Sequence, residues 1–182
     1  MKRLFTVLSM ISVLSGCVSL STPELGRQWD GRFSLSVSGN GFNENQTGRF
    51  ALTRDAAQTT ILDLKSAIGT TVARIEQHAH YAQLQAVGVP AQKADDIHAL
   101  MQSTLGFTVP VDGLEFWLDG QPIPGEPVRA TPSTPPYRQL EQYGWQIQFL
   151  SYENNAPKRL RLSREASDGA PAISMTLVIN SR

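Results

Sequence analysis

From Trp29 onward, apolar and polar residues alternate with a period of two, and this pattern constrains the fold more than any other feature of the chain. In the first run, Phe33, Leu35 and Val37 fall on one face. Runs of this kind occur at 32–37, 48–54, 59–64, 70–77, 81–87, 142–152, 158–164 and 172–179. Because successive side chains of a strand point to opposite faces, the pattern predicts about eight or more strands. The short connections between the first five favour an antiparallel meander over βαβ units.

Two segments between the strands follow other patterns. Residues 39–46 are expected to form a loop. The triplet Asn45-Gln46-Thr47 at its end matches a glycosylation acceptor, but it is expected to be part of a hairpin loop. Residues 91–104 have helical spacing, with acidic side chains suited to the first turn at Asp95 and Asp96 and a helix stop at Gly106. A second, short helix is expected at 111–119, and the proline-rich stretch that follows it is expected to be an ordered crossing.

A single sheet of this size tends to curl towards a barrel, and inserted helices would line its concave side. The sequence therefore predicts a mainly β (α+β) domain with helices over an apolar concavity, which is a natural place for a hydrophobic ligand. The length of 182 residues suits one domain with a substantial core.

The N-terminus reads as a secretory leader. Lys2 and Arg3 precede an apolar run at 4–14 that is too short to span a bilayer, and Leu14-Ser15-Gly16 leads into Cys17. This arrangement resembles a bacterial lipobox, in which the leader is removed and the cysteine carries the lipid. We therefore expect a signal peptide at 1–16, a lipidated Cys17 with a tether at 17–28, and a domain at 29–182. The alternative is an ordinary signal peptide followed by an incidental cysteine.

Composition excludes several classes of protein. The chain has 16 Lys plus Arg against 16 Asp plus Glu, so it offers no broad electrostatic attraction for nucleic acid. One cysteine is too few for a disulfide framework or a Cys-based zinc cluster. His78 and His80 would need His98, Asp95 or Asp96 to complete a metal site, and no clear third ligand is present, so we expect neither a metal nor a cofactor.

Several motifs, taken together, resemble the LolB family of outer-membrane lipoprotein receptors. The most specific are Leu105-Gly106-Phe107-Thr108-Val109-Pro110 and Trp117-Leu118-Asp119-Gly120-Gln121-Pro122. Weaker matches are Gly31-Arg32-Phe33, Ser66-Ala67-Ile68-Gly69-Thr70-Thr71, Gly144-Trp145, Pro157-Lys158-Arg159-Leu160 and Leu177-Val178-Ile179. The resemblance covers nearly all of residues 29–182.

The resemblance implies an unclosed antiparallel β-barrel with helices capping an apolar cavity. It implies a protein that accepts triacylated lipoproteins from the periplasmic carrier LolA and inserts them into the outer membrane, without catalytic residues. Val18 follows the cysteine, where bacterial lipoproteins that stay in the inner membrane typically carry Asp, so an anchor on the periplasmic face of the outer membrane is expected. The implied partners are LolA, the acyl chains of cargo lipoproteins and the membrane, and the implied state is a monomer.

The family's membrane-inserting loop corresponds here to Ile68 and Gly69. Polar Ser66, Thr70 and Thr71 surround Ile68, which does not read as core. The family usually has Pro-Leu where this chain has Ala67-Ile68, and the loss of proline predicts a less rigid loop. The alternative is a turn residue that packs back on the sheet.

Eight apolar side chains are candidates for lining the acyl-chain cavity. They are Phe33, Phe50, Leu52, Leu100, Met101, Phe116, Trp117 and Trp145. The same positions fit a filled core equally well, because alternation does not separate the two. Three rival functions also stay open: an anchored envelope protein that binds another hydrophobic ligand, a lipid-anchored hydrolase, for which no nucleophile–base pair is recognisable, and a purely structural envelope protein.

Overall fold

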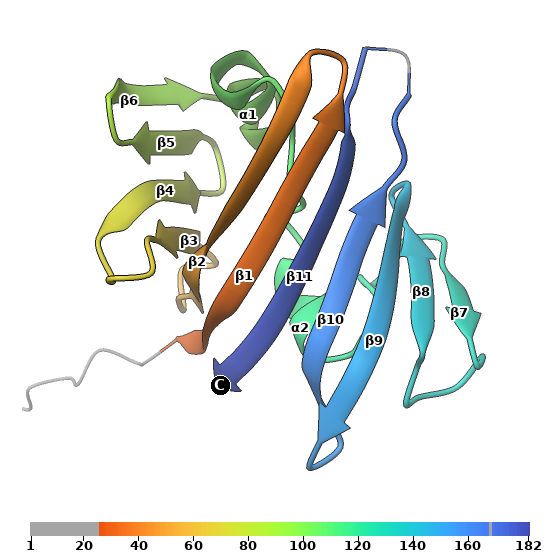
Figure 1. The fold of residues 1–182 in the computed structure, drawn as a ribbon. Helices are drawn as coiled ribbons and strands as arrows, with labels where there is room; N and C mark the ends of the chain where they lie inside the picture. The colour runs from red at the N-terminus through yellow and green to blue at the C-terminus, as the bar shows by residue number, and fades with distance from the viewer. Residues whose placement is uncertain (1–25, 168) are drawn as a thin grey trace, which may run out of the picture.

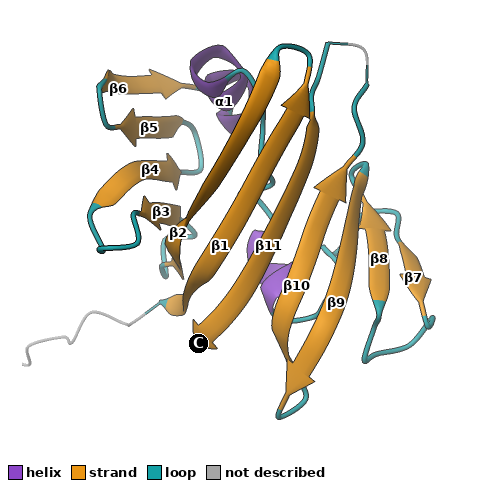
Figure 2. Ribbon diagram, in the orientation of Figure 1, coloured by secondary structure: helices purple, strands orange, loops and turns teal. Residues whose placement is uncertain are grey.

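The computed structural model describes residues 26–167 and 169–182, which form one antiparallel sheet and two helices (Figures 1 and 2). The expected leader, Cys17 and most of the expected tether lie outside the described residues. The strands are β1 (Arg27–Gly39), β2 (Phe42–Arg54), β3 (Thr60–Lys65), β4 (Thr71–Gln77), β5 (Ala82–Ala86), β6 (Val89–Ala94), β7 (Arg129–Thr131), β8 (Gln139–Gln142), β9 (Trp145–Glu153), β10 (Ala156–Arg164) and β11 (Ala172–Ser181). The helices are α1 (Ile97–Leu105) and α2 (Leu114–Leu118).

The sheet consists of two meanders joined by the first and last strands. Its order is β6-β5-β4-β3-β2-β1-β11-β10-β9-β8-β7, and every neighbouring pair is antiparallel. The two edges, β6 and β7, are separated in the chain only by the segment that carries both helices. In Figure 1, α2 lies behind β11 and β10, and α1 lies between the upper end of β2 and β6. The expected mainly β fold with an unclosed sheet and inserted helices is therefore confirmed.

The long β1–β2 hairpin corrects the loop expected at 39–46. Asn40 and Gly41 form a two-residue turn in which both have positive φ, 55° and 87°, and Gly39 pairs with Phe42 across it. Two-residue turns of this kind match the twist of the flanking strands, so the ladder continues to the tip. The Asn45-Gln46-Thr47 triplet consequently lies in β2 instead of a loop.

The helix expected at 91–104 is partly a strand. Residues 89–94 pair with β5 as the edge strand β6, where Pro90 is tolerated because one side of an edge strand needs no donor. Helix α1 begins after Asp96, whose carboxylate accepts hydrogen bonds from the backbone N–H groups of His98 and Ala99. The acidic pair therefore precedes the helix instead of occupying its first turn. The stop at Gly106 is confirmed, and its φ is 78°.

Two short strands were not expected. Strand β7 lies inside the proline-rich stretch, and β8 is separated from β9 by the turn at Tyr143 and Gly144, whose φ values are 51° and 73°. The run expected at 142–152 as one strand thus begins with the end of β8 and this turn. Helix α2 lies inside the segment expected at 111–119.

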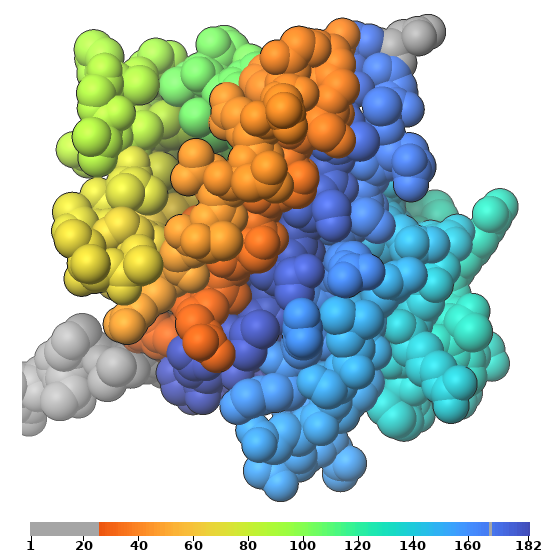
Figure 3. Space-filling view, viewed as in Figure 1, coloured from red at the N-terminus to blue at the C-terminus, as the bar shows by residue number. Residues whose placement is uncertain are grey.

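The inner face of the sheet and both helices share one apolar core. Trp29, Leu52, Met101, Trp117 and Ile147 are among its most deeply buried side chains. The outer face of the long strands forms a continuous surface across the sheet (Figure 3). Neither helix in the described part of the chain has the length and apolar composition needed to span a membrane.

Candidate functional site: an apolar interior and an exposed turn

Seven of the eight cavity candidates are buried in the shared core. Phe33 and Trp145 are 8% and 5% exposed, Leu52 and Met101 are fully buried, and Phe116 is the half-buried exception. The buried candidates come from three strands, β1, β2 and β9, and from both helices. The structure thus brings the sequence-selected residues together on one side of the sheet, where they pack against one another.

Helix α2 is held against this interior by polar contacts that the sequence did not indicate. Glu115 lies 3.0 Å from Arg54 at the end of β2. The indole N–H of Trp117 donates to Gln142 of β8 over 3.1 Å, and the indole N–H of Trp29 donates to Asp119 over 2.9 Å. A five-residue helix has little stability of its own, so these contacts and its buried apolar residues keep it in place.

Gln142 is the most buried polar link in this arrangement. Its side-chain oxygen accepts from the N–H of Ile123 over 2.9 Å as well as from Trp117, and its amide group donates to the carbonyl of Ile123 over 3.1 Å. Buried amides that lack partners are costly, and here both ends are satisfied. Gln142 therefore links β8, α2 and the segment after α2 through hydrogen bonds.

Burial raises the pKa of the Glu115 carboxyl, and the Arg54 guanidinium offsets this only in part. A carboxyl whose pKa is higher in the folded state contributes stability at low pH, and this contribution is lost as pH rises through the folded pKa. Relative to wild type, Glu115→Gln should therefore gain stability as pH rises from about 4 to about 7. Urea unfolding at both pH values measures this, with exposed Glu44→Gln as the control. A wild-type minus Glu115→Gln difference that does not change with pH would contradict it.

The turn between β3 and β4 presents Ile68 to solvent. Its side chain is 91% exposed, and residues 67 to 70 around it are exposed as well. The turn is closed by hydrogen bonds from Gly69 N to Ser66 O (2.9 Å) and from Ser66 N to Thr70 O (2.8 Å). Gly69 adopts a φ of 93°, which a side chain would make unfavourable. These contacts fix the turn although it lacks the family's proline, and Ile68 does not pack back on the sheet.

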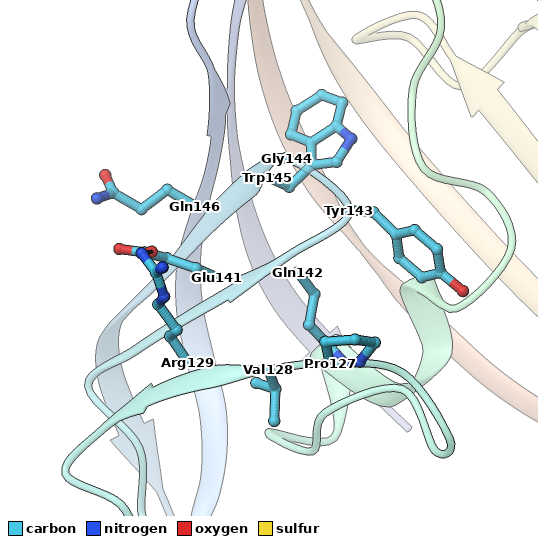
Figure 4. A pocket seen from close by; sticks show the side chains of 9 residues that line it. All are labelled: Pro127, Val128, Arg129, Glu141, Gln142, Tyr143, Gly144, Trp145 and Gln146. Atoms are coloured by element: carbon cyan, nitrogen blue, oxygen red, sulfur yellow. Dashed lines mark ion pairs between the residues drawn. The ribbon is translucent and has the colours of Figure 1, made fainter.

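A shallow groove at the β7 edge of the sheet is more polar and more open than the interior. It has a volume of about 570 Å³ and lies along β7, β8 and the β8–β9 turn. Figure 4 shows the guanidinium of Arg129 beside the carboxylate of Glu141, with the ring of Tyr143 pointing away from them. The Arg129–Glu141 pair is separated by 3.8 Å and exposed. A mixed, open surface of this kind is less suited to acyl chains than the apolar interior.

The histidines lie apart and have other partners. His78 Nε2 is 3.3 Å from Glu76, and His98 Nε2 is 3.3 Å from Asp112. Within residues 26–167 and 169–182, no group of three or more potential metal ligands is assembled. Thr59 Oγ1 lies 3.5 Å from His78 Nδ1, but Thr59 is buried and this distance is at the outer limit of a hydrogen bond. This pair therefore presents no exposed nucleophile.

Comparison with known proteins decides the family. The family model described as "Outer membrane lipoprotein LolB" matches residues 27–181, which is the whole of the described sheet. The chain belongs to the LolB family. The match starts at the first residue of β1 and includes both the exposed turn and the helical segment, so the LolB-family region and the folded domain coincide.

Relatives of this LolB-family chain support the same assignment. The outer-membrane lipoprotein LolB of Ralstonia nicotianae is 31% identical over 84% of this chain and 78% of its own length. LolB of Bordetella pertussis is 32% identical over 88% of this chain and 84% of its own, and LolB of Cupriavidus necator is 32% identical over 86% and 80%. These relatives carry the name outer-membrane lipoprotein, and this chain is one as well.

A solved structure also aligns with the LolB-family chain. The crystal structure of a LolA superfamily protein from Nitrosomonas europaea covers 85% of this chain and 84% of its own, with a TM-score of 0.47 and 10% identity.

Proposed function

We propose that this chain accepts triacylated lipoproteins from the periplasmic carrier LolA and inserts them into the outer membrane. The coarser function is that of an outer-membrane lipoprotein receptor in lipoprotein localisation. The observation that carries the finer proposal is the exposed Ile68, fixed at the tip of a hydrogen-bonded turn on a domain with a large apolar interior.

The anchor in this proposal is lipid on Cys17. Residues 18–26 separate it from β1, and an extended chain of that length spans at most about 30 Å. Each buried acyl methylene contributes about 0.8 kcal/mol, so two or more chains hold a protein stably at a membrane. The domain would therefore act close to the bilayer into which it delivers its cargo.

The interior is the proposed place for the cargo's acyl chains. The sheet is not closed, and the segment that carries α1 and α2 connects its two edge strands, β6 and β7. In this proposal the segment covers the core, and its displacement gives acyl chains access to the core. Helix α2 is short and tied by three polar contacts, each of which can break and re-form without breaking the sheet. Met101 adds adaptable surface, because an unbranched thioether side chain fits varied shapes.

The direction of transfer follows from relative affinities. Acyl chains move from the carrier to this interior, and then to the membrane, only if the free energy falls at each step. Ile68 would promote the last step by entering the bilayer and bringing the interior's cover next to it. No covalent bond changes in this sequence, so no catalytic residue is assigned.

A photo-crosslinking experiment tests the interior. Lipoprotein with a photoreactive acyl chain is loaded on LolA, mixed with this protein and irradiated, and the crosslinked residues are identified by mass spectrometry. We expect crosslinks to Leu52, Met101 and Trp117, which face the core. Crosslinks confined to the outer face of β1 and β11 would contradict the proposal. Irradiation of cargo whose photoreactive group is on the protein part is the control.

A further inference from the structure

A second turn beside the Ile68 turn is also apolar and exposed. Val87 begins the two-residue connection between β5 and β6, and its side chain is 73% exposed. Val72, near the start of β4, is 37% exposed. Hairpin turns usually contain Gly, Asn or Asp, so a β-branched residue at this position is not explained by turn formation.

The exposed residues lie on the same border of the domain. Ala73 pairs with Ala86, and Val87 N donates to Val72 O over 3.0 Å, so Val72 and Val87 are neighbours across two strands. The β3–β4 and β5–β6 turns both project at the left in Figure 1, and in Figure 3 the corresponding segments form the left border of the molecule. We name Ile68, Val72 and Val87 the apolar edge.

The apolar edge is free of charged residues at its tip. Residues 66–72 and 86–91 contain none. Behind the tip, the Arg74 guanidinium donates two hydrogen bonds of 2.7 Å to the Asp63 carboxylate, so the charges of these two side chains neutralise each other. Lys65 directly precedes the Ile68 turn, and a lysine stem can lie along an apolar surface while its ammonium group stays with lipid head groups.

We propose that Val87, with Val72, is a second membrane contact that enters the bilayer together with Ile68. This inference rests on the proposed function, because the Ile68 turn would be the first contact. The proposed tether favours a lipid surface as the occupant: β1 begins at the lower left in Figure 1, on the side of the β3–β4 turn, and its short connection to Cys17 keeps that side near the bilayer. Two contacts on neighbouring hairpins would also fix the orientation of the domain, which one contact does not.

Site-specific labelling of the full, acylated protein tests this directly. Cys17 is the chain's one cysteine and does not react once acylated, so Val87→Cys introduces a unique site for a fluorophore. The protein is placed in vesicles of phosphatidylethanolamine and phosphatidylglycerol, with or without quencher-bearing lipids. We expect at least a twofold loss of fluorescence at position 87 in quencher vesicles. Ile68→Cys is the comparison for the first contact, and Val128→Cys, exposed near the opposite edge, is the control expected to stay unquenched.

The outcomes separate the inference from the proposed function. Quenching at 68 and 87 supports the inference. Quenching at 68 alone overturns it and leaves the insertion loop standing, whereas quenching at neither position contradicts both. If the label at 87 is shielded by added LolA but not by lipid, the apolar edge is a protein-docking surface and the inference is wrong.

A functional readout complements the labelling. Val87→Ser should slow insertion of cargo into the same vesicles several-fold while reception from LolA stays unchanged, because the interior is not altered. Val128→Ser should slow neither step. Unchanged insertion by Val87→Ser would overturn the role of Val87.

Discussion

Replacing Ile68 by glutamate should leave reception of a lipoprotein from LolA intact and slow its insertion into membranes by roughly 10- to 100-fold. A buried isoleucine contributes about 1.5–3 kcal/mol by leaving water, and each 1.4 kcal/mol corresponds to about a factor of ten. The side chain is 91% exposed and its turn is closed by backbone hydrogen bonds, so the substitution changes the tip without disturbing the sheet. A charged side chain additionally resists entry into the bilayer.

To measure insertion, the variant is mixed with vesicles and with LolA that carries a lipoprotein. The amount of lipoprotein recovered with the vesicles is then determined as a function of time. Ile68→Leu should keep nearly the wild-type rate, because its apolar area is similar. Val128→Glu is the matched control, since it adds the same charge at an exposed valine elsewhere. Equal insertion rates for Ile68→Glu and wild type would show that the turn does not act at the membrane.

Trp117→Ala should have the largest effect on stability, a loss of about 3–5 kcal/mol in the free energy of unfolding. Trp117 lies in α2, is fully buried in the core, and donates a hydrogen bond from its indole N–H to Gln142. Truncation leaves a cavity, removes the apolar contact that holds a very short helix, and deprives Gln142 of one partner. Trp117→Phe keeps most of the packing and loses the hydrogen bond, so a loss nearer 1 kcal/mol is expected.

Urea unfolding followed by circular dichroism measures both variants. If Trp117→Ala loses less than about 1 kcal/mol, Trp117 does not fill the core in the free protein, and lining of an open cavity would be the better description. The experiment therefore addresses the choice between filling and lining that the sequence pattern leaves open.

The main features of the fold could be predicted from local pattern. Period-two alternation from Trp29 located the long strands, and Gly106 marked the end of α1 because a left-handed residue ends a helix. The tip of the β1–β2 hairpin was missed although Asn40-Gly41 is a strong turn signal, because polar residues at 43–47 hid the continuation of β2. Strand β6 was missed because residues 91–94 share the apolar spacing of the helix that follows.

Some residues of the candidate site could likewise be predicted from the sequence, and others could not. Ile68 could be selected from the sequence, since polar neighbours and a family motif both surround it. The polar contacts of α2 could not, because Glu115 and Arg54 are 61 positions apart in the chain and meet only when the sheet curves. Val87 carried a weak signal, a β-branched residue before Gly88 at a turn, but its position beside Val72 appears only from the strand register.

Transfer of a lipoprotein from the carrier is the most direct test of the proposed function. A soluble form beginning at Val18 is mixed with LolA loaded with a lipoprotein, the two proteins are separated, and the lipoprotein is located. We expect the lipoprotein to co-purify with this protein. If the lipoprotein stays on LolA while the domain is folded, reception is contradicted, and binding of another hydrophobic ligand becomes the leading explanation for the apolar interior.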